Sequence, residues 1–226
     1  MPEQIKTALI IPDYNEQARV CSVVEAGLAC DDVDEVIVVN DGSTDCTGDI
    51  LLGYGQSITT VTHAKNQGKG QSVQSGIEAA KLTGSSRVVL LDADLTGISA
   101  SHITDLISPI ERDGALMTIG YLGLRKAVVK KYLLNQWGAL SGQRAFELSI
   151  WSLLDEQDKD GFNIEAALNA RLRKANLHHR IARVALEGVG HVGKHDKYGN
   201  WPTALRAYWG TYANALKTYA RIEQQG

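Results

Sequence analysis

Val88-Val89-Leu90-Leu91-Asp92-Ala93-Asp94 is the stretch that decides the fold of this chain. Its apolar run is short, continuous and rich in valine and leucine, which is typical of a parallel strand buried on both faces. Two carboxylates follow, and charges taken out of water need a partner or a metal ion. Because ligands of open α/β sheets bind beyond the carboxyl ends of the strands, Asp92 and Asp94 are candidate ligands for Mg²⁺ or Mn²⁺. The alternative is an ordinary turn in which Asp92 caps the chain and Asp94 is solvated.

The rest of the N-terminal half repeats this order of strand, polar turn and helix. The expected strands cover residues 7–11, 35–39, 57–62 and 88–91, and the expected helices cover about residues 18–29, 47–53 and 71–82. Strands that alternate with helices of this length predict an α/β fold with a parallel sheet and right-handed crossovers. The polar residues that follow the four strands then meet at one edge of the sheet and form one site.

Four motifs in this half, in their order and spacing, resemble the nucleotide-sugar domain of GT-A fold glycosyltransferases. They are Ile11-Pro12-Asp13-Tyr14-Asn15-Glu16, Val38-Val39-Asn40-Asp41-Gly42-Ser43-Thr44-Asp45, Asn66-Gln67-Gly68-Lys69-Gly70 and Leu91-Asp92-Ala93-Asp94. The chain looks most like the large family that includes dolichyl-phosphate mannose synthases, and it is also similar to glucosyl-3-phosphoglycerate synthases. Two positions depart from the family pattern. Asp13 stands where the family usually has a small residue, and Asn40 stands where many members have a second aspartate.

The resemblance implies a single GT-A domain over residues 1–226, with a Rossmann-like, mostly parallel sheet flanked by helices. Residues 1–97 would bind the nucleotide sugar, residues 98–200 would bind the acceptor, and residues 201–226 would form a C-terminal aromatic helix.

The donor site implied by the resemblance takes its residues from all four motifs. The expected nucleotide-sugar contacts are Pro12, Tyr14, Asn15, Glu16, Asp41, Gly42, Ser43, Lys69, Asp92 and Ala93. The carboxylate of Asp41 can accept a hydrogen bond from a base N–H, and Lys69 can approach a phosphate or a base carbonyl between two glycines. Asp94 would bind the metal directly, and the metal would neutralise the charge on the departing diphosphate. The alternative is that these residues bind no ligand: Ser43 only caps a helix, and the residues around Lys69 only form a turn.

The second half supplies the acceptor side of the expected site. Ser141, Gly142, Gln143 and Arg144 resemble an acceptor-side loop of the same families, and residues 161–168 resemble the start of a helix beneath the sugar. Glu165 in that helix has three interpretations that the sequence leaves open. It is the general base for the acceptor hydroxyl, a hydrogen-bond acceptor for donor sugar hydroxyls, or a first-turn glutamate that stabilises the helix. Inverting and retaining stereochemistry both remain compatible with the sequence.

The histidines add a second metal ligand by resemblance. His191 matches the C-terminal histidine that often completes the metal shell in metal-dependent GT-A enzymes, with His195 as the neighbouring candidate. Imidazole is an acceptable Mn²⁺ ligand beside carboxylate and phosphate. The alternative is an unliganded loop histidine. His178 and His179 are expected to be solvated, just before the strand at residues 181–186.

Two segments raise the question of a membrane or protein partner. A helix expected at residues 203–223 carries aromatic residues on one face, which indicates packing on the domain, a homodimer contact or peripheral contact with a membrane. The basic stretch at residues 125–131 fits a phosphorylated or membrane-bound acceptor, or a solvated helix face.

Composition narrows the class of protein. The formal net charge of −3 over 226 residues argues against general nucleic-acid binding. Three cysteines without metal-type spacing indicate reduced thiols, and the sequence shows neither a signal peptide nor a run long enough to span a bilayer. We therefore expect a cytoplasmic protein, with the inner membrane surface as an alternative place of action.

Together these features predict a metal-dependent glycosyltransferase. It would move a hexose from a UDP- or GDP-sugar to a hydroxyl or phosphate acceptor, which is a lipid phosphate, a phosphorylated small molecule or a glycan. One alternative is a sugar nucleotidyltransferase, although the chain lacks an early glycine-rich basic loop after its first strand. The other is a non-catalytic subunit or sensor that binds nucleotide sugar.

Overall fold

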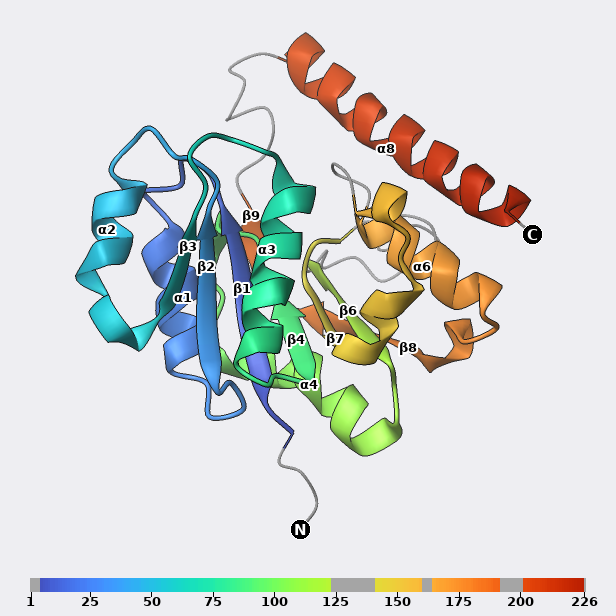
Figure 1. Ribbon diagram of the computed structural model, residues 1–226, viewed down its shortest axis with the longest axis horizontal. Helices are drawn as coiled ribbons and strands as arrows, with labels where there is room; N and C mark the ends of the chain where they lie inside the picture. Colours follow the sequence, from blue (N-terminus) through green and yellow to red (C-terminus); the bar gives the residue numbers. More distant parts are fainter. Residues whose placement is uncertain (1–4, 123–140, 160–163, 192–200, 226) are drawn as a thin grey trace.

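The computed structural model describes residues 5–122, 141–159, 164–191 and 201–225 of the chain (Figure 1). One sheet organises it, with strand order β3-β2-β1-β4-β7-β6-β8. These strands are β1 (Thr7–Asp13), β2 (Glu35–Asn40), β3 (Thr59–Thr62), β4 (Arg87–Leu90), β6 (Met117–Leu122), β7 (Arg144–Glu147) and β8 (Ile181–Leu186). Only β7 runs antiparallel to its neighbours β4 and β6; the other pairings in the sheet are parallel.

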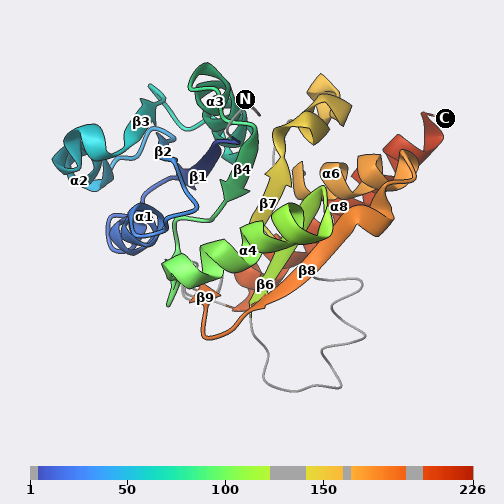
Figure 2. The same ribbon diagram turned by 90° about the horizontal axis from the view of Figure 1, so that it is seen from below.

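Helices cover both faces of this sheet (Figure 2). The helices α1 (Val20–Leu28) and α4 (Ala100–Asp113) pack on one face, and α3 (Lys69–Leu82) and α6 (Ile164–Lys174) pack on the other. Alternate residues of β1 point to opposite faces, so Leu9 and Ile11 join the first core while Ala8 and Ile10 join the second. A strand buried on both sides explains the uninterrupted apolar run in the sequence.

Smaller elements complete the architecture. They are helix α2 (Thr47–Gly53), the 3₁₀ turns at Gly55–Ser57, Leu148–Leu153, Glu156–Asp158 and His178–Arg180, and a short antiparallel ribbon of β5 (Leu95–Thr96) with β9 (Gly190–His191). The expected strands and helices of the first half are confirmed, with α3 beginning at Lys69. His178 and His179 are exposed before β8, as expected. Helix α4 was not predicted from the sequence. Residue 144 was expected in a loop, but it is the first residue of β7.

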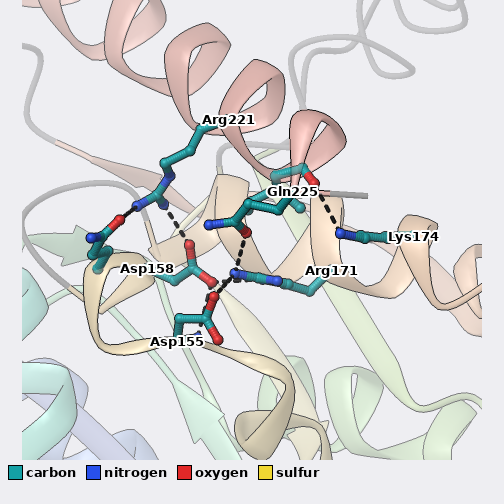
Figure 3. A network of polar contacts seen from close by, with 8 residues as sticks. Asp155, Asp158, Arg171, Lys174, Arg221 and Gln225 are labelled. Carbon is teal, nitrogen blue, oxygen red and sulfur yellow. Dashed lines mark hydrogen bonds and ion pairs between the residues drawn. The ribbon is translucent and has the colours of Figure 1, made fainter.

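The C-terminal helix α8 (Trp201–Gln224) packs against α6 through its second half, where Ala215, Thr218 and Ile222 are buried. Figure 3 shows the polar network that joins them. The buried carboxylate of Asp158 accepts hydrogen bonds from Arg171 of α6 and Arg221 of α8. This confirms the packing interpretation for that half of the helix. Of the four aromatic residues on which the membrane and dimer alternatives rest, Tyr219 packs partly buried against the core, and the side chains of Tyr208, Trp209 and Tyr212 lie outside the described residues.

Among the helices that the structure describes, none combines the length and the apolar character needed to cross a bilayer.

Candidate active site

The loops after β1 and β2 are tied together at the C-terminal edge of the sheet. The backbone N–H of Asn15 donates to Ser43 Oγ at 3.0 Å, and the Asn15 side-chain oxygen accepts from the N–H of Thr44 at 2.8 Å. Asn15 adopts a positive φ of 57°, which asparagine tolerates better than most residues. Asn40 accepts from the N–H of Ser43 at 2.9 Å. Asn15 and Ser43 therefore build the loops, and the half-exposed ring of Tyr14 faces outward beside them.

An acidic pair lies under these loops. Asp13 is buried, and no hydrogen-bond partner from the part of the chain that the structure describes reaches its Oδ2. Burial first, and then the nearby carboxylates of Glu16 and Asp45, raise the pKa of Asp13 to about 7. Glu16 itself is buried and forms an ion pair with Arg19 at 2.8 Å. An ionisable group thus lies next to the loops after β1 and β2.

Asp41 is the anchor of the loop after β3. Its carboxylate is 3% exposed and accepts hydrogen bonds from the backbone N–H groups of Gln67 and Gly68, both at 2.8 Å. The next residue, Gly42, has a φ of +70°, and a Cβ there would lie 2.5 Å from the carbonyl carbon of Lys65. Only glycine fits this close approach of two backbones. Asp41 and Gly42 together fix the loop that leads into α3.

Lys69, the first residue of α3, joins the two halves of the site. Its ammonium lies 2.7 Å from Asp92 Oδ1 and 2.8 Å from Glu165 Oε1. Burial alone would lower the pKa of Lys69, but the two carboxylates raise it above its ordinary value. In turn, Lys69 outweighs the burial of Asp92 and holds the pKa of that carboxyl below its ordinary value. The arrangement is a partly buried cation between two anions, and the Lys69 charge favours the charged form of both carboxylates.

The turn at residues 141–143 closes over this charged group. Gln143 Nε2 donates to Asp92 Oδ2 at 2.8 Å, and Ser141 Oγ donates to Gln143 Oε1 at 2.7 Å, which orients the amide. A Cβ at Gly142 would lie 2.6 Å from Asp92 Oδ2 and 2.7 Å from Lys69 Nζ. The structure therefore places Gly142 against Asp92 and Lys69 and Gln143 against Asp92, while Ser141 holds the Gln143 amide.

Arg144 has a different position from the one expected. It is fully buried, its Nε donates to the carbonyl oxygen of Ser141 at 2.7 Å, and its Nη1 donates to Asn169 Oδ1 at 2.9 Å. Burial lowers the pKa of Arg144 to about 10. A contact with an acceptor at the surface does not fit this burial, so we correct that expectation. Arg144 instead links the 141–143 turn to α6, one helical turn after Glu165.

Asp94 and His191 are brought together by the β5–β9 ribbon. Leu95, the residue after Asp94, pairs with His191 across the ribbon. Within the described residues, no three His, Cys, Asp or Glu side chains are placed to hold a metal ion by themselves. A carboxylate and an imidazole suit Mn²⁺ or Mg²⁺ when diphosphate oxygens occupy the remaining coordination positions of the metal. This donor set fits a metal that binds together with a nucleotide.

The model of one protein family, glycosyl transferase family 2, matches residues 8–176, which include the site residues described above except His191. The chain belongs to this family. A family 2 assignment favours glycosyl transfer over nucleotidyl transfer.

Two curated relatives carry more specific names. A dolichyl-phosphate beta-glucosyltransferase of Trichomonas vaginalis is 30% identical over 105 residues, which cover 41% of this chain and 30% of the relative. A 4,4'-diaponeurosporenoate glycosyltransferase of Staphylococcus aureus is 26% identical over 152 residues, which cover 66% of this chain and 39% of the relative. The matched regions thus span well under half the length of both relatives.

A solved structure confirms the fold of this family 2 chain. Glucosyl-3-phosphoglycerate synthase of Mycobacterium tuberculosis, in complex with Mn²⁺, UDP-glucose and glycerol 3-phosphate, superposes with a TM-score of 0.75 at 21% identity. The match covers 96% of this chain and 80% of that one. The expected GT-A, Rossmann-like fold is therefore confirmed.

Some expected residues of the family 2 site lie outside the described residues. They are the basic stretch at residues 125–131, the start of the motif at residues 161–163, and His195. Conversely, two residues that contact the candidate site residues were not predicted from the sequence, Asn169 and His63. Asn169 follows Glu165 by four positions, so helical spacing was a usable signal. His63, which contacts Asp41, carried no such signal.

Proposed function

We propose that this family 2 chain is a metal-dependent hexosyltransferase that uses a nucleotide diphosphate sugar, with UDP- and GDP-sugars as the donor classes to test first. The observation that carries the proposal is the Lys69 ammonium held between Asp92 and Glu165 at the end of β4. The names of the curated relatives and of the structural neighbour support the same reaction class.

The charges of the site match the needs of glycosyl transfer. When the bond between the anomeric carbon and the diphosphate breaks, negative charge develops on the leaving group, and preorganised cations lower the barrier. Lys69 is such a cation, already fixed by two carboxylates. A bound Mg²⁺ or Mn²⁺ would supply the same electrostatic stabilisation, held by Asp94 and His191.

The base and ribose belong beside the loops after β1 and β2. Tyr14 offers an exposed ring for stacking, next to the Asn15–Ser43 contact. A carboxylate offers about four acceptor positions, so Asp41 has one more for a base N–H beyond the three donors that reach it from the described residues. Pro12 and Glu16 complete the walls of the proposed slot.

Glu165 faces the sugar side of the donor. It is buried, shares the Lys69 ammonium with Asp92, and lies below the 141–143 turn. From this position it acts either on the acceptor hydroxyl as a base or on donor sugar hydroxyls as a hydrogen-bond acceptor. The chemistry of the acceptor, a lipid phosphate, a phosphorylated small molecule or a glycan, is part of the proposal to be tested.

The first test measures nucleotide binding by thermal shift. UDP, GDP, CDP and dTDP are each added with Mn²⁺ or with EDTA. A ligand at about a hundred times its Kd stabilises the native state by about 2.7 kcal/mol. We expect one nucleotide to stabilise the protein only with metal, and Asp94→Ala to abolish that shift. Asp105→Ala, which removes an exposed carboxylate on α4, is the matched control. If no nucleotide shifts the wild type, the proposed function is wrong.

The second test measures transfer. The corresponding radiolabelled nucleotide glucose or mannose is offered with a polyprenyl phosphate, with 3-phosphoglycerate or with an oligosaccharide. Label moving into one of these products identifies the acceptor class. Nucleotide binding without transfer to any of them, and without donor hydrolysis, would instead support the non-catalytic sensor.

A further inference from the structure

His63 occupies the corner between β3 and α3, just below the proposed donor site. Its Nδ1 lies 2.7 Å from Asp41 Oδ1, and its Nε2 lies 3.0 Å from Ser75 Oγ. Both the imidazole and the Asp41 carboxylate are almost completely buried. Because an ionised carboxylate only accepts hydrogen bonds, Nδ1 carries the proton in this contact.

The ring is also held by its own backbone. The N–H of His63 donates to the carbonyl oxygen of Asn40 at 2.9 Å, so the residue continues the pairing between β3 and β2. Ser75 comes from the second turn of α3. His63 therefore connects three elements: the end of β2 through Asp41, the end of β3 through its backbone, and α3 through Ser75.

The Asp41 carboxylate links His63 to the loop that contains Gln67 and Gly68. Its Oδ1 accepts from both His63 and the N–H of Gln67, and its Oδ2 accepts from the N–H of Gly68. A carboxylate that must satisfy two consecutive backbone N–H groups requires one fixed orientation. The imidazole supplies a third donor, at the same oxygen as the Gln67 N–H, and helps to hold this orientation.

The loop fixed in this way ends at the charged group of the site. Gly68, whose N–H contacts Asp41, immediately precedes Lys69, and Lys69 reaches Asp92 and Glu165. A rotation of the Asp41 carboxylate would release the Gln67 and Gly68 amides and shift the start of α3. Misplacement of a binding group by about 1 Å is enough to reduce catalysis substantially.

We propose that His63 is a positioning residue for donor binding: through Asp41 it holds the loop at residues 65–68, and with it Lys69, in the shape that receives the nucleotide diphosphate. His63 does not touch the donor. The inference rests on the proposed function for its ligand, but its structural part is testable in the protein without any ligand.

The first experiment measures amide hydrogen exchange in the ligand-free protein. We expect His63→Leu to accelerate exchange of the Gln67 and Gly68 amides by at least about tenfold, while the Leu9 and Val38 amides in the core keep their rates. His63→Asn, whose side-chain N–H₂ can replace Nδ1 as the donor to Asp41, should restore most of the protection. His178→Leu removes an exposed histidine and should change none of these rates. Unchanged exchange at Gln67 and Gly68 in His63→Leu overturns the inference.

The second experiment measures donor binding and turnover with the nucleotide that stabilises the wild type. We expect the KM for the donor to rise about tenfold in His63→Leu and to return to within about threefold of the wild type in His63→Asn. If exchange at the loop accelerates but the donor KM does not change, the positioning role for donor binding is wrong. A wild type that binds no nucleotide refutes the proposed function instead, and the exchange experiment still decides whether His63 holds the loop.

Discussion

Lys69 and Glu165, which begin two helices on the same face of the sheet, form an ion pair of 2.8 Å. The contact joins the N-terminal half of the chain to the C-terminal half, because α3 follows β3 while α6 follows β7. Asp92 shares the same ammonium, so three charges from three segments form one unit. The function of each depends on the other two.

Replacing Lys69 by methionine should remove the cation and leave two neighbouring carboxylates without it. We expect the transfer rate to fall by about 10²–10³, the size of effect seen when one preorganised donor is lost from a charge-stabilising site. Lys81→Met, an exposed change at the other end of α3, should leave the rate unaffected. Steady-state transfer kinetics of the two variants test this. Equal rates in Lys69→Met and the wild type would contradict the role of Lys69.

Replacing Gly142 by alanine should displace the charged group without unfolding the protein. The new Cβ would meet Asp92 Oδ2 and Lys69 Nζ at under 3 Å, but both atoms end flexible side chains and can move. We expect donor affinity to fall about tenfold, while the free energy of unfolding changes by less than about 1 kcal/mol. Gly53→Ala, where a Cβ meets open space, is the matched control. Calorimetric nucleotide titration and urea denaturation report the two quantities separately.

Asp13 should make stability depend on pH between about 4 and 7. Its pKa is about 7 in the folded protein against 3.8 for an ordinary aspartate, so in this range the folded state binds a proton that the unfolded state has lost. The stability that protonated Asp13 contributes therefore falls as pH rises, and this loss of stability is complete above pH 7. Asp13→Asn should stabilise the protein at pH 8 by on the order of 3 kcal/mol, and by much less at pH 4.

Urea denaturation of the wild type and Asp13→Asn at pH 4, 6 and 8 measures this difference. Asp31→Asn, at an exposed position, supplies the comparison for a general loss of negative charge. A stability difference that does not grow with pH would contradict the assignment of a raised pKa to Asp13.

Asp158 should be essential for the docking of α8. Its removal leaves Arg171 and Arg221 without their shared buried carboxylate. Breaking such a buried ionic group typically costs about 3–5 kcal/mol. We expect Asp158→Ala to destabilise the protein by this amount, whereas Glu156→Ala, whose side chain is largely exposed, should stay within about 0.5 kcal/mol. Denaturant unfolding tests both, and limited proteolysis should cut α8 first in Asp158→Ala.

Metal binding should require the nucleotide. The described residues bring Asp94 and His191 near each other, and no group of three His, Cys, Asp or Glu among them is placed to hold a metal ion. We therefore expect diphosphate oxygens to take part in the metal shell. In calorimetric titrations we expect Mn²⁺ to bind at least about tenfold more tightly with saturating nucleotide than without it. His191→Ala should remove most of this difference, and His178→Ala should not. Equally tight Mn²⁺ binding with and without nucleotide would show a preformed metal site and contradict this prediction.

The sequence predicted those parts of the molecule that follow from local pattern and strand direction. The apolar runs located β1, β2 and β4, and parallel alternation required their following loops to meet, which brought Asp41, Lys69 and Asp92 to one edge. Helix α4 could also have been predicted, because its buried apolar residues recur at helical spacing: Ile103, Leu106, Ile107 and Ile110.

Other features depend on long-range contacts that leave no local trace. β7 is four residues long and begins with a buried arginine, so it has no apolar pattern of its own. The contact between His63 and Asp41 joins residues that are not neighbours in the sequence. Neither residue type predicts that the other is its partner. The link from Arg144 to Asn169 likewise depends on how α6 packs on the sheet.

The antiparallel strand β7 also sets the order in which the molecule can be completed during synthesis. The strands β1 to β4 form a continuous parallel block, but β4 keeps an open edge until residues 144–147 have left the ribosome. An open apolar edge invites pairing with other chains. When β7 pairs with β4, it brings the 141–143 turn over Asp92 in the same step. A nascent chain thus covers this edge at the moment when Gln143 reaches Asp92, and Glu165 joins the charged group later, when α6 follows.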